Sequence, residues 1–168
     1  MSIIKTLATD TYAVVTQIGA CYFDRNTGEI GDELLVNIQI QDCLNHGLRV
    51  DAGAIKFWFE QSRQTFLENP VPLTKAAQQL REFYKKEVLV WAHATFDFPR
   101  LAEAYEKIGQ GFCFPYRKLR DIRTLVDLSN VPYKKIPKDE SQTHDALYDC
   151  KFQVKYCYEC FKELNKRR

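Results

Sequence analysis

Apolar and β-branched residues gather in three runs near the start of the chain, at residues 3–8, 13–23 and 30–40. Residues 24–28 separate the last two runs with a polar stretch that ends in glycine, a composition typical of a hairpin turn. This pattern predicts three strands in an opening β-meander. A further short apolar run at residues 88–91 predicts a buried strand later in the chain.

Apolar residues at helical spacing fill most of the chain after the meander. Asp51 is expected to cap the first helix and Thr74 the second, because their side-chain oxygens can accept from free backbone N–H groups. The predicted helices occupy residues 51–59, 74–83, 97–108, 121–128 and 144–168. Strands that come first and then alternate with helices predict an α/β sandwich around a mixed sheet.

Composition supports one soluble domain over residues 1–168. With 168 residues, 45% of them hydrophobic, the chain can bury a sizeable core, and no internal repeat or linker divides it. No apolar run approaches the roughly 20 residues of a membrane span, and polar residues interrupt the N-terminal stretch where a signal peptide would be apolar. We therefore expect a cytoplasmic protein that does not contact a membrane.

The formal net charge of +2 excludes a polycation. Basic residues still cluster at 117–120, 134–138 and 166–168, and they would matter as phosphate contacts only beside a cleft. The six cysteines are expected to be reduced thiols, since no signal peptide directs the chain to an oxidising compartment. Cys157 and Cys160 form a C-x-x-C spacing, but no second pair completes a zinc site, so we expect a structural role.

Three residues could carry chemistry. Asp97 follows a predicted buried strand, where open α/β sheets gather their ligands, although an aspartate there is often only a helix cap. His144 and Asp149 are five residues apart, which on an ideal helix would separate their side chains by about 140°. His144 must therefore lie in the segment that leads into the helix or in its first turn if both are to face one site, with one residue activating water and the other binding metal.

Five segments form an ordered set that spans nearly the whole chain. They are YAVVTQIGA at residues 12–20, TGE at 27–29, HATFD at 93–97, RDIRTL at 120–125 and HDALYD at 144–149. This set resembles the 3′-to-5′ exonucleases of the DEDDh superfamily, which includes RNase T and oligoribonuclease, and above all the short exoribonuclease-like members of bacteriophages and prophages. The resemblance implies a ribonuclease-H-like fold, an α/β mixed five-stranded sheet with helices on both faces.

The resemblance also implies site residues. His144 matches the general base, and Asp97 and Asp149 match the acids of the second and third motifs, which in the family bind Mg²⁺ or Mn²⁺. Contacts with the 3′ end of single-stranded RNA or DNA are implied for the following residues: Thr6, Leu7, Trp58, His93 and Phe96. Trp58 and Phe96 fit base stacking and core packing equally well, whereas Phe57 and Phe59 are expected in the core.

The first motif departs from the family. Counting back from Ile18 places Ile3 and Lys5 where the family has its first two carboxylates, and Asp10 would lie beyond the strand end. Two-metal hydrolysis holds its ions about 4 Å apart with several anionic ligands, which two aspartates do not supply. At an effective dielectric near 20, an adjacent ammonium opposes a cation by about 4 kcal/mol per unit charge. Metal affinity is therefore expected to be weak or lost.

Three functions remain open from the sequence. The first is a degenerate 3′-to-5′ exonuclease that binds nucleic acid but is inactive or strongly impaired. The second is an active metal-dependent exoribonuclease that uses Asp97, His144 and Asp149 with one ion. The third is a phage or prophage decoy or inhibitor that binds a host protein. A homodimer is a further expectation from the resemblance alone.

Overall fold

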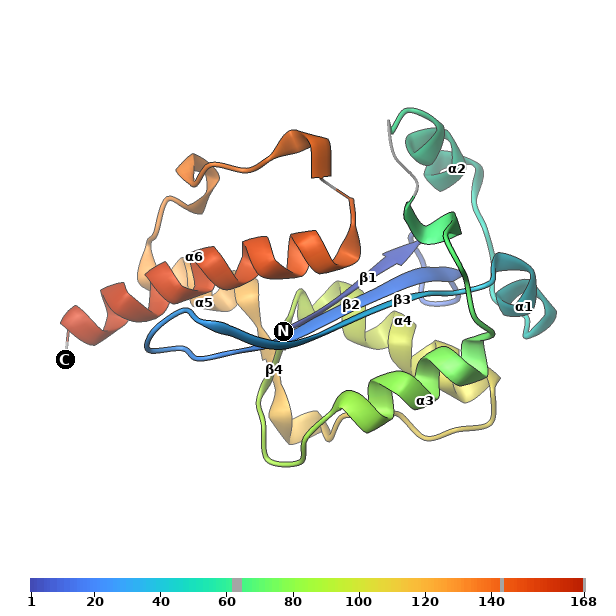
Figure 1. Ribbon diagram of the computed structural model, residues 1–168, viewed down its shortest axis with the longest axis horizontal. Helices are drawn as coiled ribbons and strands as arrows, with labels where there is room; N and C mark the ends of the chain where they lie inside the picture. Colours follow the sequence, from blue (N-terminus) through green and yellow to red (C-terminus); the bar gives the residue numbers. More distant parts are fainter. Residues whose placement is uncertain (62–64, 143, 168) are drawn as a thin grey trace.

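The computed structural model describes residues 1–61, 65–142 and 144–167. Along the chain the elements are β1 (Ser2–Thr6), β2 (Val15–Phe23), β3 (Ile30–Asn37), α1 (Ile40–Asn45), α2 (Ala52–Phe59), η1 (Thr65–Leu67), α3 (Leu73–Phe83), β4 (Val90–Ala92), α4 (Ala94–Lys107), η2 (Tyr116–Lys118), β5 (Leu119–Asp121), α5 (Ile122–Ser129), η3 (Tyr133–Lys135), η4 (Glu140–Gln142) and α6 (Ala146–Lys166). Figure 1 shows them in sequence colours. Arg168, which ends the predicted last helix, lies outside the described residues.

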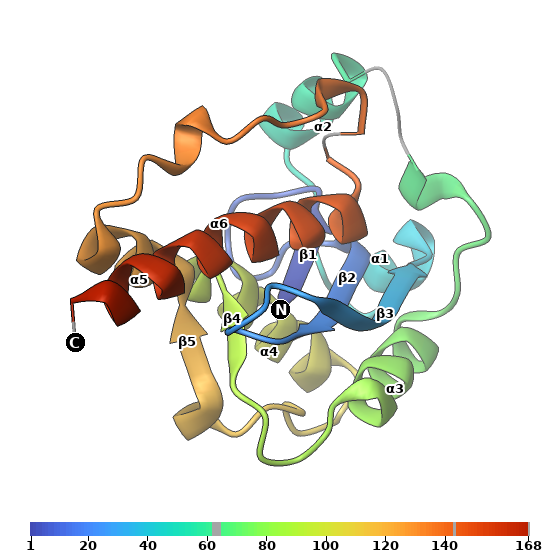
Figure 2. The same ribbon diagram turned by 60° about the vertical axis from the view of Figure 1, so that its left-hand side comes forward.

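The strands are hydrogen-bonded as two sheets. The meander β1-β2-β3 is antiparallel throughout, and β4 pairs with β5 in parallel. Figure 2 shows the two sheets side by side with β4 next to β1, and these two strands are in contact. The α/β class is confirmed, whereas a continuous five-stranded sheet is not what the hydrogen bonds among the described residues give.

The side chains of β2 point alternately to the two faces of the meander, and helices cover both faces. Ile18 and Ala20 point into one apolar core, which contains residues of α3 and α4. Cys21 points into the other core, which contains residues of α5 and α6. Figure 2 shows helices on both faces, and the first seven residues of β2 are accordingly all buried.

The predicted helix starts are right at Asp51 and wrong at Thr74. The Asp51 carboxylate accepts from the N–H of Ala54 at 2.7 Å and caps α2. Helix α3 begins at Leu73, before Thr74, and its first N–H donates 2.7 Å to the carboxylate of Asp42 in α1. A carboxylate distant in sequence thus performs the role that we assigned to a local side chain.

Helix α1, strand β5 and the four short helices η1–η4 were not predicted. The apolar run at 30–40 divides into β3 and the start of α1, and β5 is a three-residue strand in a basic stretch. Helix α4 begins three residues before Asp97, which lies in its first turn. No helix among the described residues is long and apolar enough to cross a membrane.

The start of α6 lies directly on the backbone of β2. A Cβ atom at Gly19 would lie 2.4 Å from the carbonyl carbon of Ala146 and 2.5 Å from the nitrogen of Leu147. The N–H of Ala146 also donates to the Gln17 side-chain oxygen at 2.6 Å. Only glycine permits this approach, and the helix start is therefore fixed in position by β2.

Replacing Gly19 with alanine should force these backbones apart. We expect Gly19→Ala to lower the free energy of unfolding by about 1–3 kcal/mol, the range for overpacked sites, as measured by urea denaturation. Gly31→Ala is the matched control, since its Cβ would lie 3.6 Å from Tyr22 in ordinary contact. Equal stability of the two variants would contradict the proposed backbone contact.

Candidate active site

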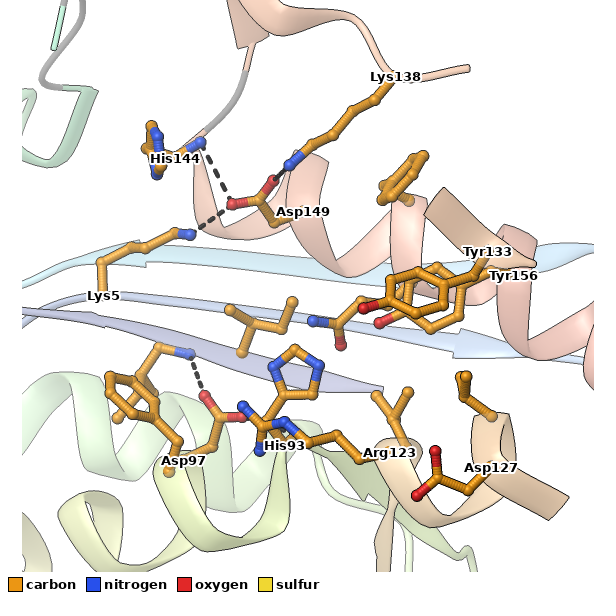
Figure 3. A pocket seen from close by; sticks show the side chains of 17 residues that line it. Lys5, His93, Asp97, Arg123, Asp127, Tyr133, Lys138, His144, Asp149 and Tyr156 are labelled. Atoms are coloured by element: carbon orange, nitrogen blue, oxygen red, sulfur yellow. Dashed lines mark hydrogen bonds and ion pairs between the residues drawn. The ribbon is translucent and has the colours of Figure 1, made fainter. Parts of the chain in front are cut away.

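A pocket of about 630 Å³ opens between β1, the start of α4, α5 and α6. Figure 3 shows its polar side chains, and Lys5, Asp97, His144 and Asp149 all line it. The structure thus brings together the three residues singled out for chemistry and the lysine that occupies a first-motif position.

Asp97 ties β1 to the start of α4. It is 2% exposed, and its two carboxylate oxygens accept from the N–H groups of Ile4 at 3.1 Å and His93 at 2.9 Å. Burial raises the pKa of this carboxyl to about 7, although both N–H donors favour the charged form. The helix-cap and active-site interpretations of Asp97 are therefore compatible, because the side chain contacts the N-cap residue of α4 and lines the pocket.

Asp149 lies between two ammonium groups. Lys5 donates to its Oδ2 atom, and the Lys138 Nζ lies 2.9 Å from its Oδ1 atom. The backbone N–H of His144 also donates to Oδ2 at 3.2 Å. Burial disfavours the charged carboxylate, but the two lysines outweigh it and hold the pKa of Asp149 below its usual value.

His144 lies in the segment that leads into α6, one of the two positions that its spacing from Asp149 allows. Its φ of 71° lies in the left-handed region, an uncommon conformation for a residue with a side chain. The ring contacts the rings of Phe57 and Trp58 edge to face, with centroids 5.0 and 5.9 Å away. The imidazole therefore stands between α2 and the pocket.

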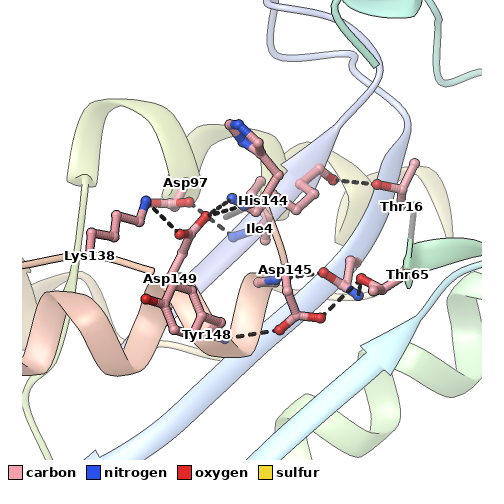
Figure 4. Close-up of polar contacts among 12 residues, drawn as sticks. Ile4, Thr16, Thr65, Asp97, Lys138, His144, Asp145, Tyr148 and Asp149 are labelled. Carbon is pink, nitrogen blue, oxygen red and sulfur yellow. Dashed lines mark hydrogen bonds and ion pairs between the residues drawn. The ribbon is translucent and has the colours of Figure 1, made fainter. Parts of the chain in front are cut away.

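A polar network holds the segment that carries His144. The Gln17 Nε2 donates to the Asn37 Oδ1 at 2.8 Å and to the Thr65 hydroxyl oxygen at 3.2 Å. The Thr65 hydroxyl in turn donates to the Asp145 carboxylate at 3.0 Å (Figure 4). Asp145 in turn accepts from the N–H of Tyr148 at 2.9 Å and caps α6. Asp145, the residue next to His144, is thus bonded to Thr65 of η1, which is in turn bonded to Gln17 of β2.

The two positions of β1 that the resemblance assigns to acids hold Ile3 and Lys5. Ile3 is 5% exposed and packs in the apolar core beneath α6, while Lys5, two residues later on the same face, pairs with Asp149. Asp10 lies beyond the end of β1, in a turn where it accepts from the N–H of Tyr12. It is not among the residues that line the pocket.

Two of the five expected substrate contacts line the pocket, namely His93 and Phe96. Burial, reinforced by the nearby Arg123 guanidinium, lowers the pKa of the His93 imidazole to about 4, so this ring is neutral at neutral pH. The Phe96 ring lies 3.9 Å from the Arg100 guanidinium carbon, and Arg100 also donates to the Phe96 carbonyl at 2.7 Å. Phe96 is thereby held at the pocket wall.

The other three, Thr6, Leu7 and Trp58, are buried outside the pocket lining. Trp58 is 7% exposed and its Nε1 donates to the Thr6 carbonyl at 3.0 Å, which fits core packing. The expectation that Phe57 and Phe59 are buried is wrong, because they are 41% and 82% exposed. One turn of α2 can bury only one of three consecutive aromatic residues, and here that residue is Trp58.

Sequence reasoning missed several residues of the pocket: Arg123, Asp127, Tyr133, Lys138, Gln153 and Tyr156. Two signals were available. Lys138 belongs to a basic run that we tied to phosphate binding only beside a cleft, and it does line one. Gln153 lies four residues after Asp149 and so shares its face of α6.

The residues present do not fit a pair of divalent ions. No group of three or more His, Cys, Asp or Glu suited to a metal occurs within residues 1–61, 65–142 and 144–167. All four carboxylate oxygens of Asp97 and Asp149 already face N–H or ammonium groups. A cation would have to displace Lys5 and Lys138 from Asp149 before it could bind there.

Comparison with protein families gives one match. The model described as the 3′-5′ exoribonuclease Rv2179c-like domain matches residues 3–161. Neither the curated proteins nor the solved structures give a match.

Removing the Lys5 ammonium should destabilise the fold. The side chains of Lys5 and Asp149 are only 13% and 12% exposed, so Lys5→Met leaves a shielded carboxylate with one ammonium partner instead of two. We expect a loss of about 1–3 kcal/mol in urea denaturation, and a smaller loss when Asp149→Asn is added.

Lys85→Met is the matched control for this experiment. It removes an ammonium from Asp32 at a surface pair whose side chains are 62% and 69% exposed, where solvent screens the charges. Its denaturation midpoint should remain close to that of the parent protein. A Lys5→Met midpoint that is equally unchanged would contradict a stabilising role of Lys5.

Proposed function

Because the chain belongs to the 3′-5′ exoribonuclease Rv2179c-like domain family, we propose that it binds single-stranded RNA 3′ ends but hydrolyses them very slowly or not at all. The pairing of Lys5 and Lys138 with Asp149 carries this proposal. Exonucleases of this kind use divalent metals. Here the ammonium groups of Lys5 and Lys138 pair with the Asp149 carboxylate, to which such an ion would bind.

The repulsion between the Lys5 ammonium and a bound cation can be estimated from Coulomb's law. A unit charge and an ammonium group about 4 Å apart repel each other by about 4 kcal/mol at an effective dielectric near 20, and a divalent ion feels about twice that. Asp97 offers little compensation, since both of its oxygens accept from backbone N–H groups. Binding of Mg²⁺ or Mn²⁺ should therefore be weak or lost, and His144 would have no metal-bound water to activate.

The strand arrangement supports a ribonuclease-H-like fold for this family member. Strand β4 contacts β1, and β5 pairs with β4 in parallel, an order that is compatible with one layer of strands between helices (Figure 2). We infer that residues 1–168 form one exonuclease-like domain on this basis. The pocket then lies beside β1, where the family holds its first acidic pair.

Exposed aromatic side chains support RNA binding. Phe57 is 41% exposed and its ring contacts the His144 ring, while Phe59 is 82% exposed at the end of α2. Trp58 anchors the same helix through its hydrogen bond to Thr6. Aromatic rings presented beside a nuclease pocket can stack on successive bases, each worth about 1–3 kcal/mol. This surface favours the nucleic-acid role over a decoy that binds only protein.

Hydrolysis tests the proposal directly. The parent chain, incubated with labelled single-stranded RNA and Mg²⁺ or Mn²⁺, should release little or no product. The double variant Ile3→Asp with Lys5→Glu restores two carboxylates beside Asp97 and Asp149, and we expect it to shorten RNA from a free 3′ end. Adding His144→Ala should reduce that recovered rate by about 100-fold or more, the usual contribution of a general base.

The response of the melting temperature to metal distinguishes a variant that folds without activity from one that does not fold. The double variant crowds four carboxylates together, so it should melt at a lower temperature in EDTA and regain stability when Mn²⁺ is added. The melting temperature of the parent chain should not respond to Mn²⁺. Rapid metal-dependent hydrolysis by the parent chain would overturn the proposal.

A further inference from the structure

The side chains of Cys21 on β2 and Cys150 on α6 touch in the apolar core that these two elements enclose. Their Sγ atoms are 3.4 Å apart, within hydrogen-bond distance for sulfur, although the residues are 129 positions apart in the sequence. The proposed function uses neither thiol. We propose that Cys21 and Cys150 form a reversible redox pair, which hydrogen peroxide oxidises to a disulfide that bonds α6 covalently to β2.

The alignment of α6 on β2 places these two thiols opposite each other. Gln17, Gly19 and Cys21 share one face of the strand, since alternate residues point the same way. The first two of them meet Ala146 at the start of the helix. Cys150 lies one turn further along the same face of α6 and therefore meets Cys21. The contact thus follows from the packing of two regular elements.

Little movement separates the two thiols from a disulfide. The sulfur atoms of a disulfide are about 2.05 Å apart, so each Sγ atom needs to move by only about 0.7 Å. Cys21 is 2% exposed and Cys150 is 0% exposed, so the surrounding core holds both side chains in place. A bond between them would close a long loop, and such a bond stabilises the folded state by restricting the unfolded chain.

Cys21 is the residue that attacks the oxidant. The Cys150 thiol donates a hydrogen bond to the Cys21 sulfur, and this bond lowers the pKa of Cys21 because it stabilises the thiolate. Burial raises the pKa of Cys150, which therefore keeps its proton. Since thiolates rather than thiols react with peroxides, the pair consists of a nucleophile in contact with a protonated partner.

A small oxidant can reach Cys21 from the surface. This residue lines an apolar cavity of about 180 Å³ beside the first residues of β1 and β4. The lining also includes Arg25, Val88 and Leu89, which are exposed, so the cavity opens to solvent. A water molecule takes up about 30 Å³, and hydrogen peroxide is only slightly larger. The cavity is therefore large enough to admit peroxide.

The oxidation balances with one molecule of hydrogen peroxide. The Cys21 thiolate attacks a peroxide oxygen, the O–O bond breaks and hydroxide leaves, so that Cys21 becomes a sulfenic acid. The Cys150 sulfur then attacks the Cys21 sulfur, the S–O bond breaks, and the departing hydroxide takes the thiol proton to form water. Two electrons pass from the sulfur atoms to the peroxide. A dithiol reductant reverses the reaction by thiol–disulfide exchange.

Peptide mapping of the oxidised full chain tests the proposal. The protein is treated with hydrogen peroxide, alkylated under denaturing conditions and digested with trypsin without reduction. Cleavage after lysine and arginine places Cys21 in peptide 6–25, Cys150 in peptide 139–151 and the C-x-x-C cysteines in peptide 156–162. We expect a disulfide between the first two peptides that disappears on treatment with dithiothreitol. Disulfides that involve only the last two peptides, with Cys21 still alkylated, would overturn the proposal.

The melting temperature provides a second measurement. Peroxide should raise the melting temperature of the parent chain by about 5–15 °C, and dithiothreitol should restore the original value. Cys150→Ala should show no rise, because Cys21 then has no partner. If Cys150→Ala does not fold, Cys21→Ala removes the other thiol and should give the same result.

Cys157→Ala is the matched control. It removes an equally buried thiol from the same helix and the same core but leaves the proposed pair intact, so the rise in melting temperature should persist. A rise that persists in Cys150→Ala or is absent from Cys157→Ala would overturn the proposal. These experiments use neither RNA nor a metal ion, so their outcome is separate from that of the proposed function.

Discussion

The contact between the start of α6 and the middle of β2 determines where the side chains of the pocket point. At Gly19 the two backbones touch, and Gln17 bonds the first N–H of the helix. With that end fixed, Asp149 on the first turn can only face β1, and His144 in the preceding segment must adopt a left-handed backbone to enter the helix. Packing, rather than the pocket's own polar contacts, therefore sets the geometry of the site.

Once Asp149 faces β1, its charge requires a partner. A carboxylate that is 9% exposed is strongly unfavourable in a protein interior unless cations or N–H donors surround it. A nuclease meets this requirement with metal ions, and this chain meets it with Lys5 and Lys138. Ile3 lies in the apolar core beneath α6 and needs no charged partner. The site is thus electrostatically balanced with no ion bound.

Local patterns in the sequence predicted what depends on local physics. The β-meander, the Asp51 cap and the place of His144 near the start of a helix follow from alternation, cap chemistry and helix geometry. The cap of α3 comes instead from Asp42, thirty-one residues before Leu73, and no local pattern reveals such a partner. Lys138 and Gln153 could not be assigned to the pocket for the same reason, since only the folded path of the chain brings them beside Asp149.

The structure also shows why matching acids are weak grounds for assigning catalysis. Asp97 holds the backbone of Ile4 and His93, so it joins β1 to α4 whether or not a metal ever binds. Asp149 likewise accepts from the backbone of His144 and from two lysines. Both residues make contacts that stabilise the fold, and these contacts would explain their presence in an inactive chain. The residues of β1 that line the same pocket, Ile3, Ile4 and Lys5, include no acid.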